Sequence, residues 1–389
     1  MAKKVNKAVA VIVGVLFLII GICVGFYAKT FVFATVYKIP ETHVKNDFEV
    51  SSGIEVEVIK EKELSIHFIE LGNKYTGDCT LIKVGNTEIL IDAGSRANSV
   101  TPIYNYVSDY VTDGELEYVI VTHAHQDHYA GFATGQNVES LLDKFNARTI
   151  ITFSKTNQKE TGTLYKNFNR ELDETKAKNG TTVYNALECF NEENGAKRIY
   201  DLSSSIQLEI LYQKFYEQKS STENNYSVCC TINQKISETE TKKYLFTGDL
   251  EEDGEKSLIE NNTIGEVELY KAGHHGSKTS SSAQLMSVIK PKIVCVCCCA
   301  GSSEYTSTNE NQFPTQKFVD NVAPYTFKVF VTTLCVDYKN GEFTSMNGNI
   351  VVYYDNGEVK VNCSNNATFL KDTEWFKKNR TLPSAWQIT

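Results

Sequence analysis

The sequence predicts a protein of the α/β (α+β) class, with one membrane-spanning helix before it. Short apolar runs that end at turn residues recur along the chain, and segments with helical periodicity separate them. An uncharged apolar run follows three lysines near the N-terminus. With 389 residues and 41% hydrophobic content, the chain can fill one large core or two modest ones.

The N-terminus carries the clearest targeting signal. Lys3, Lys4 and Lys7 precede the apolar run 8–26, which is close to the roughly 20 residues that a membrane helix needs. We therefore expect a single-pass protein of the cell membrane that contacts the lipid bilayer through residues 8–26. The positive-inside rule places the N-terminus in the cytoplasm and the rest of the chain outside. A cleaved signal peptide, which would give a secreted form, is the alternative.

Strands dominate the part of the chain that follows. Residues 29–63 are mixed and partly charged, which indicates a stalk, and the folded domain is expected to begin near residue 64. The turn Gly85-Asn86 predicts a hairpin between the second and third strands. The expected early strands are 65–71, 79–84, 88–92, 117–122 and 149–153.

Helical segments alternate with strands in the rest of the domain. The polar stretch 156–195 indicates surface helices and loops with little core, and the tail 363–389 is expected to pack on the domain as a last helix. The expected helices are 99–111, 141–145, 163–176, 251–261 and 281–289. The expected later strands are 207–212, 227–232, 243–247, 267–272, 292–298, 328–332 and 348–354.

The charge and the cysteines exclude some classes of protein. A net charge of −9 argues against a protein that coats nucleic acid electrostatically, so any such contact would need metal ions or local lysines. The 11 cysteines are clustered, at Cys229-Cys230 and in the run 295–299, in apolar strand-like segments. Neighbouring residues of a strand point to opposite faces, so we expect small buried hydrophobic residues and no disulfide framework. The spacing also lacks the paired C-x-x-C pattern of structural zinc sites.

Four residues of metal-ligand type follow the apolar strand that ends near residue 122. His123, His125 and Asp127 alternate, and an extended segment projects alternate side chains to one side. His128 comes one residue later, where the chain turns, and can face a second point close by. Imidazole and carboxylate ligands suit zinc and manganese, and two such ions about 3.5 to 4 Å apart can activate water. The segment therefore predicts one or two divalent ions, with the metal left open.

Two later segments supply further ligand types. Asp249 follows an apolar strand and could bridge two metals, although a helix N-cap is the alternative for this residue. His274 and His275 follow another strand, and we expect one of them to be a ligand and the other to lie near the reacting group.

The motifs resemble those of the metallo-β-lactamase superfamily, and specifically its branch that contains the ComEC-type DNA-uptake proteins. Their order and spacing agree over roughly residues 64–360. The motifs are Ile91-Asp92-Ala93-Gly94, the segment 123–128, Thr247-Gly248-Asp249 and Lys271-Ala-Gly-His-His-Gly-Ser277.

This resemblance implies an αββα sandwich with the metals at one edge, between the two sheets. Its implied ligands are His123, His125, Asp127, His128, Asp249 and one of the two later histidines. His274 is favoured because it comes first after the strand. Asp127 has a second implied role as a base, and Asp92 and Gly94 would order the metal loop. The expected organisation is a cytoplasmic tip and anchor (1–28), a stalk (29–63), a hydrolase domain (64–362) and a packed tail (363–389).

The sequence departs from many superfamily members at one point, which the ComEC-type branch commonly shares, and from that branch at two further points. No histidine lies between His128 and His274, so one metal would have only His123, His125 and Asp249 and would bind weakly. Phe313-Pro314 stands in place of a His-Pro pair. The turn 72–78 is longer than the usual Gly-Gln-Gly-Asp turn.

The leading hypothesis is an extracellular, membrane-anchored phosphodiesterase or nuclease-like hydrolase that uses metal-activated water. The substrate would be DNA or a phosphodiester polymer of the cell wall. His275 would be catalytic, Ser277 and Lys278 could hold the phosphate, and the resemblance adds Asn225 and Ser227 as substrate-binding candidates. A hydrolase of carbonyl substrates (lactones, amides or β-lactams) and an inactive surface binding module are the alternatives.

Overall fold

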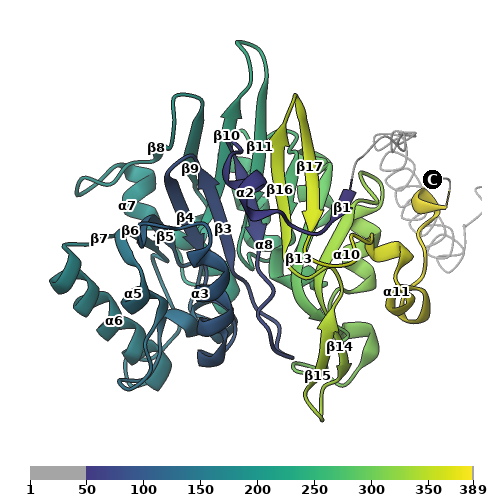
Figure 1. Cartoon of the computed structure of the whole chain (residues 1–389), viewed down its shortest axis with the longest axis horizontal. Coiled ribbons are helices and arrows are strands. Elements are labelled where there is room, and N and C mark those ends of the chain that lie inside the picture. The colour runs from purple at the N-terminus through teal and green to yellow at the C-terminus, as the bar shows by residue number, and fades with distance from the viewer. Residues whose placement is uncertain (1–49, 388–389) are drawn as a thin grey trace, which may run out of the picture. The chain divides into compact units, whose positions relative to one another are not determined.

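Two β-sheets and the helices that flank them make up the part of the chain that the computed structural model describes, residues 50–387 (Figure 1). The mixed α/β class predicted from the sequence is confirmed. Apolar residues from both sheets form one continuous cluster, so the sheets pack face to face.

The first sheet, sheet 1, has nine strands in the order β1-β17-β16-β2-β3-β4-β5-β6-β7. Strands β4 to β7 are parallel to one another, whereas β16, β2, β3 and β4 pair antiparallel. The predicted hairpin turn at Gly85-Asn86 is confirmed, since Val84 pairs with Thr87. The strands are β1 Val50–Ser52, β2 Ser65–Phe68, β3 Thr80–Val84, β4 Thr87–Ile91, β5 Glu115–Ile120, β6 Asn146–Thr152, β7 Thr182–Asn185, β16 Ile350–Asp355 and β17 Glu358–Cys363.

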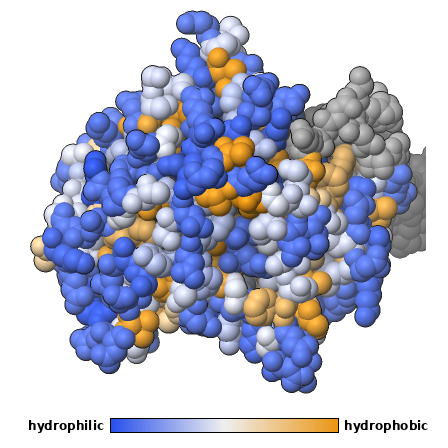
Figure 2. Space-filling model, in the orientation of Figure 1, coloured by the Kyte–Doolittle hydropathy of each residue, from blue (hydrophilic) through white to orange (hydrophobic). Residues whose placement is uncertain are grey.

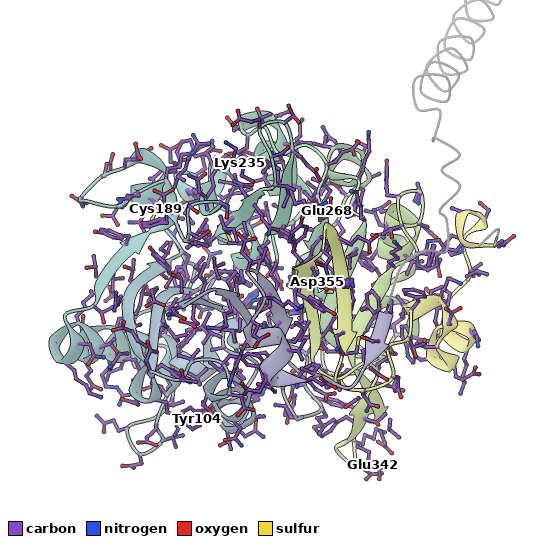
Figure 3. All side chains as sticks on the ribbon, turned by 45° about the horizontal axis from the view of Figure 1, so that its top comes forward. Tyr104, Cys189, Lys235, Glu268, Glu342 and Asp355 are labelled. Atoms are coloured by element: carbon purple, nitrogen blue, oxygen red, sulfur yellow. The ribbon has the colours of Figure 1, made fainter. Side chains whose placement is uncertain are left out.

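The second sheet, sheet 2, has eight strands in the order β15-β14-β13-β12-β11-β10-β9-β8. Its central strands β11 to β14 are parallel. The hairpin of β14 and β15 extends beyond the rest of the sheet, and Glu342 lies near its tip (Figures 1 and 3). The strands are β8 Ile199–Asp201, β9 Ile206–Leu211, β10 Cys229–Lys235, β11 Thr241–Phe246, β12 Leu269–Lys271, β13 Ile293–Ala300, β14 Val329–Asp337 and β15 Glu342–Ser345.

Helices flank the sandwich, and several of them begin and end at clear capping signals. Asn185 accepts from the backbone of Glu188 and so starts α7, while Gly180 ends α6 in the left-handed conformation. The helices are α2 Val56–Lys60, α3 Val100–Ser108, α4 Gln126–Tyr129, α5 Leu141–Lys144, α6 Thr163–Asn179, α7 Ala186–Asn191, α8 Glu252–Asn261, α9 Ala283–Ile289, α10 Gln316–Val322 and α11 Glu374–Asn379.

The cysteine-rich strand β13 is buried on both faces. Cys295 and Cys297 join the cluster between the sheets, whereas Val294 and Cys298 join the cluster under α8, α9 and α10. The ten cysteines in the described residues are free, and all but the half-buried Cys335 are buried. They act as small hydrophobic residues, as the clustering predicts. Polar residues cover most of the face in Figure 2, with apolar groups scattered among them.

The structure adds elements that the sequence patterns did not indicate. Residues 50–60, assigned to the stalk, carry β1 and α2, and β1 pairs with β17 because Ile59 and its apolar neighbours pack on the core. The polar stretch 156–195 contains the predicted helix as α6, and it also contributes β7 and α7, which were not predicted. In the tail, Phe376 and Trp386 are buried. No helix within residues 50–387 is long and apolar enough to cross a bilayer, and the predicted anchor 1–28 lies outside the described residues.

His67 is a buried histidine in the middle of β2. Its Nε2 lies 2.8 Å from Ser65 Oγ, and its Nδ1 lies 2.9 Å from Tyr106 Oη. Burial, helped by the charge of Lys83, lowers the pKa of His67 from 6.5 to about 3.

This lowered pKa predicts a specific acid sensitivity. Between pH 6.5 and 3 the unfolded chain binds a proton at His67 and the folded chain does not, so the free energy of unfolding falls as pH falls. The slope from this one group is about 1.4 kcal/mol per pH unit. Urea unfolding at pH 5 to 8 should show a shallower slope for His67→Gln than for the natural chain. Equal slopes would show that His67 does not contribute.

Candidate metal centre

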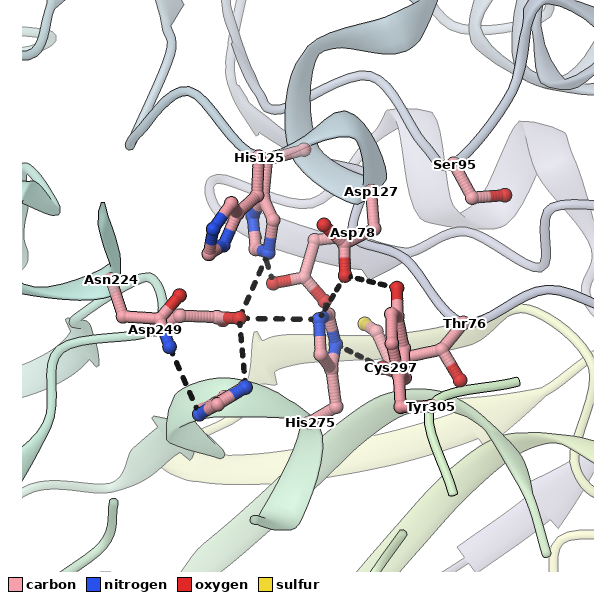
Figure 4. A network of polar contacts seen from close by, with 12 residues as sticks. Thr76, Asp78, Ser95, His125, Asp127, Asn224, Asp249, His275, Cys297 and Tyr305 are labelled. Carbon is pink, nitrogen blue, oxygen red and sulfur yellow. Dashed lines mark hydrogen bonds and ion pairs between the residues drawn. The ribbon is translucent and has the colours of Figure 1, made fainter. Parts of the chain in front are cut away.

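The predicted ligands meet at one edge of the sandwich, where strands of both sheets end. Asp92 follows β4, and the histidine-rich segment follows β5 in sheet 1. Asp249 follows β11, and His275 follows β12 in sheet 2. Because neighbouring strands are parallel there, their carboxyl ends lie together. Figure 4 shows Asp127, Asp249 and His275 pointing toward one another from these segments.

Asp92 organises the histidine-rich segment. Its carboxylate accepts hydrogen bonds from the backbone N and the Oγ1 of Thr122, both at 2.8 Å, and from His128 Nδ1, also at 2.8 Å. Its backbone has a positive φ of 60°, an uncommon conformation for a residue other than glycine. Because Nδ1 of His128 is hydrogen-bonded to Asp92, the other ring nitrogen, Nε2, points to the centre of the cluster.

Asp249 is placed by a tight turn. Its backbone N donates to Ser227 Oγ at 3.0 Å. Gly248 has a φ of +52°, and a Cβ atom there would meet Ser227 Oγ at 2.7 Å and Thr122 Cβ at 2.9 Å. Only glycine therefore fits at this close approach of three segments.

His274 and His275 lie in a 3₁₀ turn at Gly273–Gly276, both with positive φ (47° and 54°). This conformation sends the two side chains in different directions. His275 is fully buried, and its Nδ1 donates to the Cys297 carbonyl at 2.8 Å. Its Nε2 thereby faces the cluster.

Four ligand atoms converge on one point. His128 Nε2 lies 3.1 Å from Asp249 Oδ2, and His275 Nε2 lies 3.3 Å from both Asp249 Oδ2 and Asp127 Oδ2. Bonds of 2.0 to 2.2 Å around a tetrahedral ion put neighbouring ligand atoms about 3.3 Å apart. These three spacings match those between neighbouring ligands of a divalent metal ion.

Asp78 and Lys271 lie on the Nδ1 side of His128 and His275, away from the centre of the cluster. Asp78 belongs to a buried group with His128, Asp249 and His275 whose ligand-type atoms lie within 4.8 Å of one another. It faces the outer nitrogens, at 3.2 Å from His275 Nδ1 and 3.6 Å from His128 Nδ1, and it forms an ion pair with Lys271. Since those nitrogens point away from the convergence point, we assign Asp78 to orienting the histidines.

His123 and His125 form a smaller neighbouring group. His123 Nε2 lies 3.1 Å from His125 Nδ1, and the rings of His123 and His128 are 4.2 Å apart. Ser227 Oγ lies 3.4 Å from His123 Nδ1 and also holds the Asp249 backbone. Asp249 thus lies beside both groups.

The electrostatics of the cluster favour a cation. Burial alone lowers the pKa of His128, but the carboxylates of Asp249 and Asp92 outweigh it and raise that pKa to about 10. Burial alone would also lower the pKa of His275, but the carboxylates of Asp249 and Asp78 outweigh it and raise that pKa well above its usual range. Burial would raise the pKa of Asp127, but His275 and His128 lower it, so this carboxylate stays ionised.

Orphaned buried atoms support the same conclusion. In residues 50–387, His128 Nε2, His275 Nε2 and Asp249 Oδ1 are buried and form no hydrogen bond. Buried polar atoms are rarely left unpaired. Asp127, His128, Asp249 and His275 therefore fit a divalent cation, which would replace the protons on the two histidines.

The other predicted residues lie around this centre. The sequence favoured His274 as a ligand, but its Nδ1 bonds Thr279 Oγ1 at 2.9 Å and its Nε2 stays 4.0 Å from Asp249. Lys278 reaches outward to Asn311, and Ser277 Oγ lies 3.1 Å from Thr279 Oγ1.

Two further residues play parts that no motif assigned to them. Asn225 accepts from the Glu251 backbone at the start of α8. Gly94 is close-packed, because a Cβ atom on it would meet Ser99 Cβ at 2.9 Å.

Sequence reasoning missed three residues of the site. Asp78 and Lys271 lie inside segments that resembled family motifs, so position next to those motifs could have indicated them. Tyr305, whose hydroxyl donates to Asp127 Oδ2 at 2.7 Å, carries no such signal, because 178 positions separate the two residues in the sequence.

The chain is similar to known proteins over this region. A family model described as the metallo-beta-lactamase superfamily matches residues 72–137, which contain Asp78, Asp92 and the histidine-rich segment. No curated protein matches the chain.

Several solved structures are similar to the chain at low identity. The metallo-beta-lactamase fold protein YhfI from Bacillus subtilis is 11% identical, with a TM-score of 0.39 over 72% of this chain and 99% of that chain. The metallo-beta-lactamase SMB-1 is 12% identical, with a TM-score of 0.33 over 57% and 82% of the two chains. A diphosphatase of the PhnP family is 9% identical, with a TM-score of 0.31 over 60% and 85%.

Replacing Gly248 should damage the centre specifically. Gly248→Ala adds a Cβ atom against Ser227 and Thr122, so it should shift Asp249 and weaken metal binding as well as folding. Gly265→Ala is the matched control, because Gly265 also has a positive φ (+70°) but nothing lies within 4 Å of its added Cβ atom. The control should lose only about 1 to 2 kcal/mol of stability. Urea unfolding and a metal titration of both variants test this, and equal metal affinity would contradict it.

Metal binding should release protons and strengthen with pH. Because the pKa of His128 is about 10 without metal and that of His275 is also raised, both are protonated at pH 7. One ion should then release about two protons. Calorimetry in buffers of different ionisation enthalpy, from pH 6 to 9, measures this number. Binding with no proton release would show that these histidines are not ligands.

Proposed function

Because the match over residues 72–137 supports membership of the metallo-β-lactamase superfamily of hydrolases, we propose that this protein is a metal-dependent phosphodiesterase. Asp127, His128, Asp249 and His275 hold one divalent ion. His123 and His125, which lie beside this group, would hold a second ion more weakly. Zinc and manganese both suit this ligand set.

The observation that carries the proposal is the position of Asp249 between two ligand groups. Its Oδ2 lies 3.1 Å from His128 Nε2, and Ser227 joins its backbone to the His123 side chain. Sites that clamp a phosphodiester commonly use two ions that share a carboxylate. Bound ions would supply a Lewis acid for the phosphoryl oxygens and would activate water for attack.

The protein residues around the ions have separate tasks. Asp92 holds Nδ1 of His128, while Asp78 and the Cys297 carbonyl hold Nδ1 of His275, which fixes both rings. Lys271 neutralises Asp78. A ligand shell held in this way needs no reorganisation when substrate binds.

A polar groove beside His274 supports an extended substrate. It is open to solvent, has a volume of about 690 Å³, and includes Thr279, which contacts His274. Lys256, Lys278 and Lys317 line it, together with Glu251, Glu252 and Asp253. A polymer with anionic and polar units suits the groove, so DNA and a phosphodiester wall polymer are the proposed substrates.

The two adjacent histidines then exchange the roles expected from the sequence. His275 is the ligand, because its Nε2 contacts Asp127 and Asp249. His274 lies at the groove, where its side chain is 21% exposed and can contact the substrate with Asn225, Ser277 and Lys278.

The proposal extends to the finer family branch and the location. The motifs at 247–249 and 271–277 support the ComEC-type branch. The lysines before the apolar run 8–26 support a membrane anchor with the catalytic domain outside the cell. Protease treatment of intact cells tests this, since cleavage of the domain is expected and full protection would contradict the orientation.

Hydrolysis of bis(p-nitrophenyl) phosphate tests the activity. The full chain, purified without chelator, should hydrolyse this diester, lose activity with EDTA, and regain it with Mn²⁺ or Zn²⁺. Asp127→Ala should lower kcat/KM by more than about 100-fold, because even residues behind metal ligands cost 10- to 100-fold. Asp173→Ala, on the exposed face of α6, is the matched control and should keep full activity.

Two other outcomes would redirect the assignment. A metal-loaded protein that hydrolyses lactones or β-lactams and leaves the diester intact would establish a carbonyl hydrolase. A protein that binds no metal and hydrolyses neither class would establish a surface binding module.

A further inference from the structure

Tyr305 combines a solvent-exposed ring with a direct contact to the metal centre. It lies in the loop between β13 and α10 and is 55% exposed, yet its Oη donates to Asp127 Oδ2 at 2.7 Å (Figure 4). Of the six ligands predicted from the sequence, four are buried and two are half-buried. Tyr305 is therefore more exposed to solvent than any of these six residues.

The loop that carries Tyr305 is anchored on both sides. Glu304 accepts from the backbone N of Thr76 at 2.8 Å and from Arg96 Nη2 at 2.8 Å. Gly301 N donates to the Phe313 carbonyl at 2.9 Å, and the Phe313 ring lies 6.0 Å from the Tyr305 ring. The position of the hydroxyl is thus determined by contacts of its neighbours as well as by its own bond to Asp127.

The C-terminal tail holds the other end of the same loop. The Arg380 guanidinium donates to the carbonyls of Pro314 at 2.8 Å and Gln312 at 2.6 Å. Arg380 itself packs on the Trp375 ring, 4.8 Å from its centre. These contacts of Arg380 hold the segment in which the Phe313 ring lies beside the rings of His274 and His275.

Two buried hydrogen-bond donors near the centre serve the protein itself. Lys271 is paired with Asp78 and lies 3.7 Å from Asp249. His275 Nδ1 donates to the Cys297 carbonyl, and Phe313 carries no polar side-chain atom. The Tyr305 hydroxyl differs from these, because it is bonded to a ligand on the accessible side of the centre.

We propose that Tyr305 is a catalytic residue whose hydroxyl donates a hydrogen bond to a non-bridging oxygen of the bound phosphodiester. This assignment rests on the function proposed above. In the free protein the hydroxyl donates to Asp127, and a phosphoryl oxygen that enters the site would accept this hydrogen bond in place of Asp127, whose carboxylate would be a weaker acceptor with a metal ion bound. The phenol keeps its proton throughout, so no covalent bond to hydrogen is broken.

Such a bond contributes most in the transition state. Attack by water adds negative charge to the phosphoryl oxygens, and a hydrogen bond to a charged acceptor strengthens accordingly. A donor placed in advance at that position raises kcat more than it lowers KM. By the usual strength of such bonds, its loss should reduce kcat by about 10- to 100-fold.

The test compares Tyr305→Phe with the natural full-length chain on bis(p-nitrophenyl) phosphate. Phenylalanine keeps the ring beside Phe313 and removes only the hydroxyl, and an unchanged Tm confirms that the variant is folded. Tyr338→Phe is the matched control, since the Tyr338 ring packs on Tyr75 at the β14 and β15 hairpin, away from the ligands. We expect kcat to fall by about 10- to 100-fold in Tyr305→Phe alone, with KM, Mn²⁺ content and Mn²⁺ affinity unchanged.

Two results would overturn the assignment while the proposed function stands. One is an unchanged kcat in Tyr305→Phe. The other is a loss of activity that follows a loss of Mn²⁺ affinity and disappears in excess Mn²⁺, since the hydroxyl would then only orient Asp127 as a ligand. An inactive natural chain that binds Mn²⁺ would instead overturn the proposed function, and this assignment with it.

Discussion

The burial of four carboxylates at one edge of the sandwich is the constraint on which the site depends. Asp78, Asp92, Asp127 and Asp249 are all at least 92% buried, and Lys271 is the lysine paired with them there. Without a metal, protonated His128 and His275 offset much of the remaining charge, which explains their raised pKa values. A divalent ion carries the same charge as those two protons. The cluster is thus electrically suited to exchange two protons for one ion.

The two sheets make this concentration of charge tolerable. Parallel strands β4 and β5 of one sheet, and β11 to β13 of the other, end at the same edge, so each carboxylate follows a rigid strand. Segments between the strands then meet at contacts too close for larger residues, as at Gly248. The uncommon positive φ values at Asp92, His274 and His275 are held by these contacts. Precise placement of the ligands therefore comes from the packed strands, while accessibility comes from the loops.

The accessible side of the centre is built from distant parts of the chain. Glu304 joins the loop that carries Tyr305 and Phe313 to Thr76, in the loop between β2 and β3. Arg380 of the tail binds the other end of the same loop at the Pro314 carbonyl. The tail is accordingly part of the support of the site, beyond covering the outer face of sheet 2. The half-buried His274 contacts Thr279, which lines an open groove with Lys256, Lys278 and Lys317.

Local sequence patterns were enough to predict the mixed class, most of the strands that form the core, and the ligand types. These properties depend on residues a few positions apart, such as the alternation of apolar residues in β13 or of His123, His125 and Asp127. The sequence could not decide between His274 and His275, because adjacent residues are distinguished only by the backbone conformation of their turn. The motifs could have indicated Asp78 and Lys271 as site residues but not the side of the histidines on which they lie, and no motif could indicate that Tyr305 reaches Asp127 across 178 positions. Those contacts exist only when two sheets pack face to face, since packing alone brings strand ends and loops from separate parts of the chain to one edge.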